Sequence, residues 1–275
     1  MRSPNPASDW MAEQPLIGVV GLPPLPGSYG WRGGGLAEIR DRALRDAEAY
    51  AQAGFDALML QNVGDLPVPE RVGPETIAWL TAAGAAVASA VDLPLGVSVL
   101  KNDGPAALAV AQAIGARFVR VKVWIGAMVG AEGLVQGCAR EVLEYRRRIG
   151  AEEIAVWADV HDRTGVPLAS MPLEQAAHEA VAFGKADVLV VTGGDPGETV
   201  DWVDRVKRSV PGVPIAIGGG ARLDTLEPML RCADAVIVAT AVKLGGQIGQ
   251  PVDAQAAADF VEAARRARRC TAVPS

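Results

Sequence analysis

The run IAVWADVHD (154–162) ends with an acid and an imidazole placed two positions apart. These side chains, Asp159 and His161, are of the types that transfer protons in enzymes. His161 is one of two histidines in the chain, and the other, His178, falls within a helical pattern and is expected on the surface. We therefore predict that Asp159 and His161 take part in proton transfer. The alternative is a hydrogen-bonded polar pair in the core.

Two cations share one face of the run FVRVKVW (118–124), because Arg120 and Lys122 are separated by a single residue. An unpaired buried charge is costly, so both cations need a counter-charge, and Asp159 is the expected partner. Burial and the neighbouring Arg120 would lower the pKa of Lys122, which favours an amine nucleophile or a stabiliser of an electrophile. An ion pair between Lys122 and Asp159 without any reaction is the alternative.

Glycine clusters follow two other apolar runs, in TGGDPG (192–197) and GGG (218–220). Glycine lets backbone N–H groups approach an anion closely. The predicted phosphate site consists of Gly193, Gly194, Gly218, Gly219, Gly220, Ala239 and Thr240. A tight turn that needs glycine is the alternative. A dinucleotide site is not predicted, because no acidic partner follows at the required distance.

Other polar residues at or after the apolar runs are candidates for binding a substrate. Asp and Asn also favour turns and helix N-caps, so a structural role is the alternative for several of them. The candidates are Arg120, Gln61, Asn62, Asp65, Ser98, Lys101, Asn102, Asp103, Thr192, Asp195 and Lys243. No second histidine is placed to join Asp159 and His161 on a transition metal, so no metal site is predicted. Weak binding of Mg²⁺ through carboxylates and a substrate phosphate is compatible with the sequence.

An apolar run followed by a helical pattern recurs eight times along the chain. The predicted strands span 15–22, 55–62, 94–100, 118–124, 154–161, 187–193, 214–220 and 234–240. The predicted helices span 36–52, 74–91, 105–115, 132–149, 172–184, 198–209, 223–232 and 253–269. This repetition without a linker predicts one α/β domain, a closed (β/α)₈ TIM barrel over residues 15–270, after a flexible segment over residues 1–14. A doubly wound open sheet is the alternative.

A barrel gathers the candidate residues at one end, because the loops after its strands form the C-terminal face, where active sites lie. Successive side chains of a strand point to opposite faces, so Ala155, Trp157, Asp159 and His161 should point into the barrel. Asp159 and His161 then fall at its mouth, beside the cations of the neighbouring strand.

Composition narrows the class of protein. A net charge of −6 and a pI near 5.1 argue against a nucleic-acid partner. Three cysteines without CxxC spacing favour a reduced, cytoplasmic setting. No apolar run is long enough to cross a bilayer, so no transmembrane segment is predicted. A homo-oligomer is compatible with the sequence.

Nine short motifs lie at the strand ends and in the loops. They are LPPLPGS (22–28), QNVGDLP (61–67), LGVSVLKND (95–103), FVRVKVWIGA (118–127), ADVH (158–161), VVTGG (190–194), GGGARLDTL (218–226), VKLGG (242–246) and PVD (251–253). In combination, these motifs resemble the BtpA/SgcQ family. The resemblance covers nearly the whole barrel and implies a TIM barrel with a phosphate-type site. Some members are associated with biogenesis of photosynthetic membrane complexes, and others are similar to enzymes of sugar or nucleoside metabolism.

The chain departs from the family pattern at strand ends and in the loops just beyond them. Gly21 stands where the family has a histidine, and Gln61 stands where it has a glutamate. Ser98 and Lys122 each replace an asparagine, and Thr164 replaces a second histidine. These departures imply either altered chemistry or the loss of an ancestral reaction.

Residues and resemblance together predict an enzyme acting on a phosphorylated sugar or nucleoside-like small molecule. Lyase or aldolase-like, isomerase and glycoside-cleaving reactions are all compatible with the candidate residues. The alternative is a non-catalytic biogenesis or assembly factor for a membrane complex, with a vestigial barrel pocket. The retained Asp159, His161 and glycine loop favour the enzyme, whereas the missing histidine and glutamate favour the alternative.

Overall fold

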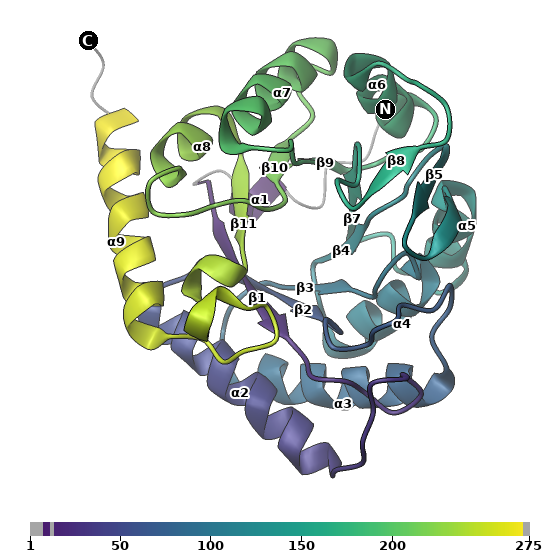
Figure 1. Ribbon diagram of the computed structural model, residues 1–275, viewed down its shortest axis with the longest axis vertical. Coiled ribbons are helices and arrows are strands. Elements are labelled where there is room, and N and C mark those ends of the chain that lie inside the picture. Colours follow the sequence, from purple (N-terminus) through teal and green to yellow (C-terminus); the bar gives the residue numbers. More distant parts are fainter. Residues whose placement is uncertain (1–7, 12–13, 272–275) are drawn as a thin grey trace.

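A computed structural model describes residues 8–11 and 14–271 of the chain. Within them, eight parallel strands close into a barrel in the order β1-β11-β10-β9-β7-β4-β3-β2. Figure 1 shows helices surrounding these strands. The predicted single (β/α)₈ barrel is therefore confirmed. The strands are β1 (Leu16–Gly21), β2 (Ala57–Gln61), β3 (Leu95–Ser98), β4 (Phe118–Val121), β7 (Ala155–Asp159), β9 (Val188–Val191), β10 (Ile215–Ile217) and β11 (Ala235–Val238).

The outer helices alternate with the barrel strands along the chain. They are α2 (Leu36–Ala53), α3 (Pro74–Ala90), α4 (Gly104–Ile114), α5 (Ala139–Arg148), α6 (Leu173–Ala182), α7 (Pro196–Ser209), α8 (Leu226–Cys232) and α9 (Ala254–Thr271). Two short 3₁₀ helices, η1 (Thr240–Val242) and η2 (Leu244–Gly246), lie between β11 and α9. No helix within the described ranges is both long and apolar enough to cross a membrane.

A small antiparallel sheet lies outside the barrel, and one of its strands occupies the first part of a predicted helix. Its order is β6-β5-β8, formed by β5 (Ala127–Gly130), β6 (Gly133–Gln136) and β8 (Gly165–Pro167). The helix predicted over 132–149 begins only at Ala139, because Gly133 and Gly137 disfavour a helix before that point. Gly133 also has a φ of 90°, which suits the turn between β5 and β6.

The barrel interior is a separate apolar layer from the one between strands and helices. Its members include Val19, Met59, Phe118, Trp157 and Val190. Gly96 leaves room for the Phe118 ring, because a Cβ at position 96 would lie 2.2 Å from that ring. The interior is therefore packed, and only the open end above it can hold a ligand.

Residues 8–11 close the other end of the barrel. They form α1 (Ser8–Met11), in which Trp10 stacks on Trp157 and Phe118 with ring centroids 5.8 and 5.6 Å apart. Met11 is buried. The segment expected to be flexible, 1–14, otherwise includes residues 1–7 and 12–13, which lie outside the described residues.

Candidate active site

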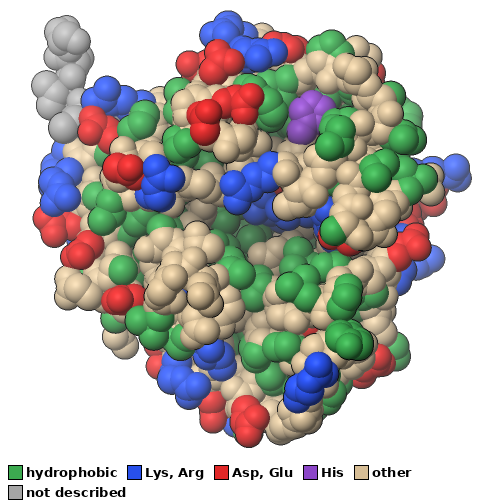
Figure 2. All heavy atoms as spheres, in the orientation of Figure 1, with side chains coloured by type: hydrophobic (Ala, Val, Ile, Leu, Met, Phe, Trp, Pro, Cys, Tyr) green, Lys and Arg blue, Asp and Glu red, His purple; other side chains and the backbone are tan. Residues whose placement is uncertain are grey.

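The inner faces of the strands continue into polar residues at the C-terminal mouth. Ala155 and Trp157 lie in the interior layer, as alternation predicts, and Asp159 is the next residue on that face of β7. The same alternation on the other strands adds Gln61, Ser98, Arg120, Thr192 and Gly218. In the space-filling view, Lys and Arg side chains gather beside a central hollow (Figure 2).

Arg120 and Asp159 form the centre of this polar group. Arg120 donates to both carboxylate oxygens of Asp159, from Nε at 2.8 Å and from Nη2 at 2.9 Å. Its Nη1 donates to the carbonyl of Gly218 at 3.1 Å, so one guanidinium links β4, β7 and the end of β10. Both side chains are about 95% buried. Such a two-pronged contact fixes the carboxylate in one orientation.

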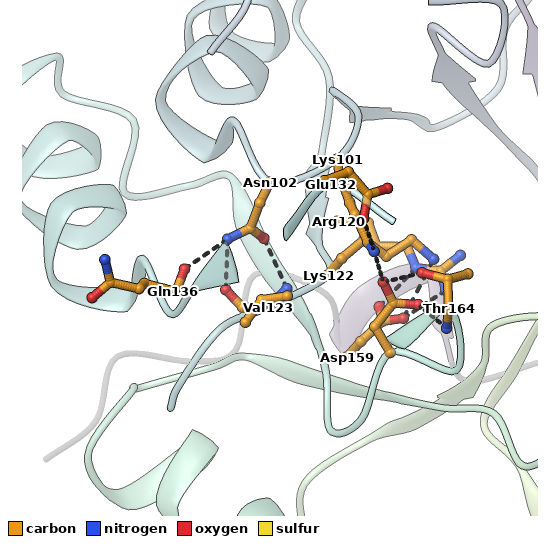
Figure 3. Close-up of polar contacts among 10 residues, drawn as sticks. Lys101, Asn102, Arg120, Lys122, Val123, Glu132, Gln136, Asp159 and Thr164 are labelled. Carbon is orange, nitrogen blue, oxygen red and sulfur yellow. Dashed lines mark hydrogen bonds and ion pairs between the residues drawn. The ribbon is translucent and has the colours of Figure 1, made fainter. Parts of the chain in front are cut away.

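Lys122 completes the cluster on the Asp159 side, as Figure 3 shows. Its Nζ lies 3.5 Å from Asp159 Oδ2, so the predicted proximity of Lys122 and Asp159 is confirmed. Burial and the neighbouring Arg120 lower the pKa of Lys122, and they outweigh the opposite effect of Asp159 and Asp162. The ammonium therefore releases its proton more readily than that of an ordinary lysine.

A second ion-pair group adjoins the first. Lys101 Nζ lies 3.3 Å from Asp162 Oδ2 and 3.1 Å from Glu132 Oε2. Asp162 also accepts from the Thr164 backbone N–H at 3.1 Å and from its hydroxyl at 2.8 Å. Burial raises the pKa of Asp162, but Lys122, Thr164 and Lys101 outweigh it and lower the pKa overall. The turn of the β5–β6 hairpin is thus joined through Glu132 to the barrel mouth.

His161 lies at the rim, just beyond the end of β7. Its ring centroid is 6.2 Å from that of Trp202 on α7, in an edge-on arrangement. Partial burial lowers the pKa of His161 below its ordinary value of 6.5. His161 lines the same cavity of about 330 Å³ as Lys122 and Asp159. Of the four residues predicted to converge in one cavity, these three line it, whereas Arg120 is buried against Asp159 and does not line it.

The glycine loop after β10 faces the same opening. Gly220 has a φ of 81°, so a tight turn accounts for that glycine. Gly219 lies beneath a cation, because a Cβ there would be 3.5 Å from Arg163 Nη2. No hydrogen bond from the N–H groups of Gly219 or Gly220 is found within residues 8–11 and 14–271. The loop therefore offers free donors beside a guanidinium.

Two buried hydroxyls at the mouth have no hydrogen-bond partner among the described residues. They are Ser98 Oγ at the end of β3 and Thr192 Oγ1 just after β9. Thr192 Oγ1 would lie 2.8 Å from a Cβ on Gly218, so it borders the glycine loop. Gln61, at the end of β2, is also buried and stands beside Ser98 in the strand register. Buried polar groups are normally paired, so these hydroxyls mark where a ligand can bind.

The other predicted phosphate-binding glycines have partners within the protein. Gly193 N–H donates to Thr199 Oγ1 at 3.0 Å, and Gly194 N–H donates to Glu198 Oε2 at 2.5 Å. Both acceptors belong to the first turn of α7, so these N–H groups are hydrogen-bonded to the start of the helix and are not available to an anion. Ala239 and Thr240 stand at the start of η1, and the Thr240 side chain is exposed.

Four predicted substrate-binding residues instead brace the loops after β2 and β3. Asn62 donates to Asp65 Oδ2 at 2.8 Å and accepts from Leu100 N–H, while Asp65 Oδ1 accepts from Leu25 N–H at 2.7 Å. Asn102 donates to the carbonyls of Val123 and Gln136 and accepts from Val123 N–H at 2.8 Å (Figure 3). Asp103 caps α4 by accepting from Ala106 N–H. The structural alternative thus accounts for all four.

Asp195 and Lys243 also have structural partners. Asp195 caps α7 by accepting from Glu198 N–H at 2.9 Å. Lys243 Nζ lies 2.6 Å from Asp46 Oδ2 of α2 and is fully buried. The expectation that Lys243 meets an anionic substrate does not fit this position, which is between the barrel wall and α2. The loop after β11 brings Lys243 to α2, and the spacing of residues in the sequence does not predict this contact.

Three charged residues at the mouth were absent from the predicted set. Asp162 and Arg163 directly follow His161 in the same motif, so their position in the sequence was the available signal. Glu132 fell within a predicted helix and gave no such signal. Within the described residues, no group of three or more His, Cys, Asp or Glu could hold a metal ion.

A comparison with known proteins identifies the family. The family model described as "BtpA family" matches residues 12–266. The chain belongs to the BtpA family. It is 42% identical over 236 residues to an uncharacterized protein of Pyrococcus horikoshii, covering 85% of this chain and 89% of that one. It is 35% identical over 258 residues to the "Photosystem I biogenesis protein BtpA" of Synechocystis sp., covering 92% and 89%.

A more distant relative and two solved structures complete the comparison. The "Putative sgc region protein SgcQ" of Escherichia coli is 30% identical and covers 94% of this BtpA-family chain and 96% of its own. The N-(5'-phosphoribosyl)anthranilate isomerase of Pyrococcus furiosus superposes with a TM-score of 0.55 at 14% identity, covering 92% and 99%. A dihydropteroate synthase of Xanthomonas albilineans gives 0.59 at 15% identity, covering 96% and 95%. The predicted family is confirmed, and the two structures support the barrel fold.

Proposed function

We propose that this BtpA-family protein is an enzyme that binds a phosphorylated small molecule at the barrel mouth and transfers protons through Lys122. The observation that carries the proposal is the buried Arg120–Asp159 pair, which holds Lys122 at the wall of a cavity. A buried lysine with a lowered pKa in a cleft is a frequent feature of catalytic sites.

The substrate anion is assigned to the glycine loop after β10. Gly219 lies beside Arg163 and Thr192, because a Cβ there would be 3.5 Å from Arg163 Nη2 and 3.8 Å from Thr192 Cγ2. Among the described residues, neither the Gly219 and Gly220 N–H groups nor the Thr192 hydroxyl has a hydrogen-bond partner. Backbone N–H groups and a guanidinium are donors that suit phosphate oxygens. Loops after the last two strands of a barrel frequently bind phosphate, which is consistent with this assignment.

The geometry supports different roles for Asp159, Lys122 and His161. Both oxygens of Asp159 accept hydrogen bonds from Arg120, so we assign Asp159 to positioning Lys122. Lys122 is the proton donor to a developing substrate oxyanion. His161 has a pKa below 6.5 and is therefore mainly neutral near pH 7, which suits a proton acceptor on the other side of the cavity.

An isomerase or lyase reaction next to a substrate carbonyl fits these roles best. Such a reaction needs a proton acceptor at carbon and a donor at oxygen, which His161 and Lys122 supply. Glycoside cleavage ordinarily uses two available carboxylates. At this mouth the Asp159 and Asp162 oxygens are occupied by Arg120, Thr164 and Lys101, so glycoside cleavage is less well supported.

The test is a thermal-shift panel of sugar phosphates and nucleotides, each beside its unphosphorylated form. Binding raises apparent stability, so phosphorylated ligands should raise the melting temperature and their partners should not. NMR of the stabilising mixtures should then show conversion by the native protein and none by Lys122→Met. Lys185→Met, at a site just after α6, is the matched control and should keep the activity. Conversion that persists in Lys122→Met would overturn the proposed role.

A second candidate function rests on a different surface. Val129, Leu134 and Val166 are direct cross-strand neighbours on the small sheet, and their side chains are 47, 56 and 70% exposed. Contiguous exposed apolar side chains are typical of protein-binding surfaces. Together with the name of the Synechocystis relative, this surface favours a non-catalytic assembly factor as the alternative.

The two functions respond to different substitutions. Val129→Lys with Val166→Lys should abolish an assembly function without altering ligand-induced stabilisation or turnover. Lys122→Met should abolish turnover and leave assembly intact. Both variants can be tested for complementation of a strain that lacks a relative of this protein. If Lys122→Met restores function and the double lysine variant does not, the protein is an assembly factor.

A further inference from the structure

We infer that the substrate has two unlike ends, a phosphate and a planar, largely apolar ring, and that the ring occupies the cavity beside Lys122. This inference rests on the proposed function and specifies its substrate class. It comes from the cavity of about 330 Å³ that Lys122, Asp159 and His161 share.

Most of the cavity wall is apolar. Trp124 and Ile125 line it beyond the end of β4, Met128 lines it from β5, and Leu168 and Met171 line it between β8 and α6. Methionine side chains adapt to flat ligands and make favourable contacts with rings. A cavity of about 150 Å³ in another protein holds benzene, so this space is large enough for a ring of one or two cycles.

The carboxylates at one end of the cavity have little capacity left to accept from sugar hydroxyls. Asp159 accepts from Arg120 through both oxygens, and Asp162 is occupied by Thr164 and Lys101. Hydroxyl groups placed against the apolar wall would lose water without gaining partners, which costs free energy. A ring is therefore a better occupant than a polyhydroxylated chain.

The anion site and the ring cavity are connected through the Arg120–Asp159 pair and through lining residues that both cavities share. Arg120 donates to the Gly218 carbonyl on the anion side, and its partner Asp159 contacts Lys122 on the ring side. A neighbouring cavity of about 460 Å³ is lined by Thr192 and Arg163 and shares His161 with the ring cavity. A molecule with phosphate at one end and a ring at the other would thus place its middle beside His161 and its ring beside Lys122.

The experiment compares four related ligands by isothermal titration calorimetry: ribose, ribose 5-phosphate, a nucleoside and its 5'-monophosphate. We expect the 5'-monophosphate to bind about tenfold or more tightly than ribose 5-phosphate, because its base buries additional apolar surface in the cavity. Arg163→Met should weaken both phosphorylated ligands by the same factor. Met128→Gln should remove the gain from the ring and leave ribose 5-phosphate unchanged.

Val129→Gln is the matched control, because Val129 follows Met128 on β5 but has an exposed side chain. It should leave all four affinities unchanged. If Met128→Gln does not fold, Met171→Gln serves as the second variant. Equal affinity for ribose 5-phosphate and the nucleotide would overturn the ring assignment and leave the proposed function standing. Absence of binding by both phosphorylated ligands would instead remove the proposed function.

Discussion

Two polar regions at the C-terminal end of the barrel look alike in sequence but differ in what they bond to. After β2 and β3, the side chains of Asn62, Asp65, Asn102 and Asp103 bond largely to backbone groups of nearby loops. Between β4 and β7, Arg120, Lys122 and Asp159 bond mainly to one another.

The difference follows from what each region must satisfy. Loops at the barrel end expose backbone N–H and C=O groups that need partners once they are buried, and short amides and carboxylates supply them. The strand ends have no such need, because their backbone is already paired in the barrel. Charged side chains there carry a desolvation cost and, apart from the Arg120 bond to the Gly218 carbonyl, do not bond to the backbone. Such groups are more often retained for function.

The most sensitive test of this contrast is covalent labelling of lysine. Pyridoxal 5'-phosphate is a phosphorylated planar aldehyde that forms an imine with a neutral amine, and borohydride then fixes it as a secondary amine. We expect labelling at Lys122, whose pKa is lowered, and its complete loss in Lys122→Arg. Peptide mapping by mass spectrometry gives the site.

Lys243 is the internal control for that labelling. Burial also lowers its pKa, yet its Nζ is fully buried against Asp46. It should stay unlabelled in both proteins. Labelling of Lys243 in place of Lys122 would show that the mouth does not bind the probe.

Asp159→Asn should cause the largest loss of stability. It leaves Arg120 and Lys122 buried without a full counter-charge, and breaking a buried pair costs roughly 3–5 kcal/mol. Asp103→Asn is the matched change in the other region. It keeps an N-cap acceptor for Ala106 N–H, but it weakens the pair with the half-exposed Arg71 and loses the hydrogen bond from Val72 N–H, so it should cost about 1–3 kcal/mol. Urea unfolding of both variants measures the two values, and similar losses would contradict the contrast.

Asn102→Ala should lower the free energy of unfolding by about 1–3 kcal/mol, because it leaves the buried N–H of Val123 without its partner. Ligand-induced stabilisation should persist in this variant, since Asn102 bonds to loop backbone on the far side of β4 from the anion site. Calorimetric unfolding with and without ribose 5-phosphate separates the two effects. A variant that folds normally but no longer binds ribose 5-phosphate would show that Asn102 contacts the substrate.

Asp162 should make a smaller, pH-dependent contribution to the free energy of unfolding. Its folded pKa lies below the ordinary value of 3.8, so the unfolded chain binds the proton more tightly. The stability that Asp162 supplies is therefore complete above about pH 4 to 5 and is lost as pH falls through the folded pKa. Asp162→Asn should flatten the acid side of the stability curve measured between pH 5 and 2. An unchanged slope would show that Lys101 and Lys122 do not stabilise its charged form.

The sequence alone determined the barrel and much of the mouth. Eight alternating patterns predict eight strands and helices because the periods of the two elements differ, and this local property survives folding. Alternation along β7 likewise places Asp159 on the interior face after Ala155 and Trp157. Paired charges at Arg120, Lys122 and Asp159 follow from the cost of burying one of them alone.

Only the tertiary structure decided which polar residues are free to meet a ligand. Sequence cannot show that Lys243 turns outward to Asp46, that the N–H groups of Gly193 and Gly194 are taken by α7, or that Arg163 reaches over Gly219. The Lys243 and Arg163 contacts join residues far apart in the chain, because loop paths depend on the packing of the surrounding elements. The Gly193 and Gly194 contacts are local, but the sequence does not show whether a side chain or a ligand takes those N–H groups. The small sheet likewise gains its third strand from β8, which returns to pair with β5 of the β5–β6 hairpin.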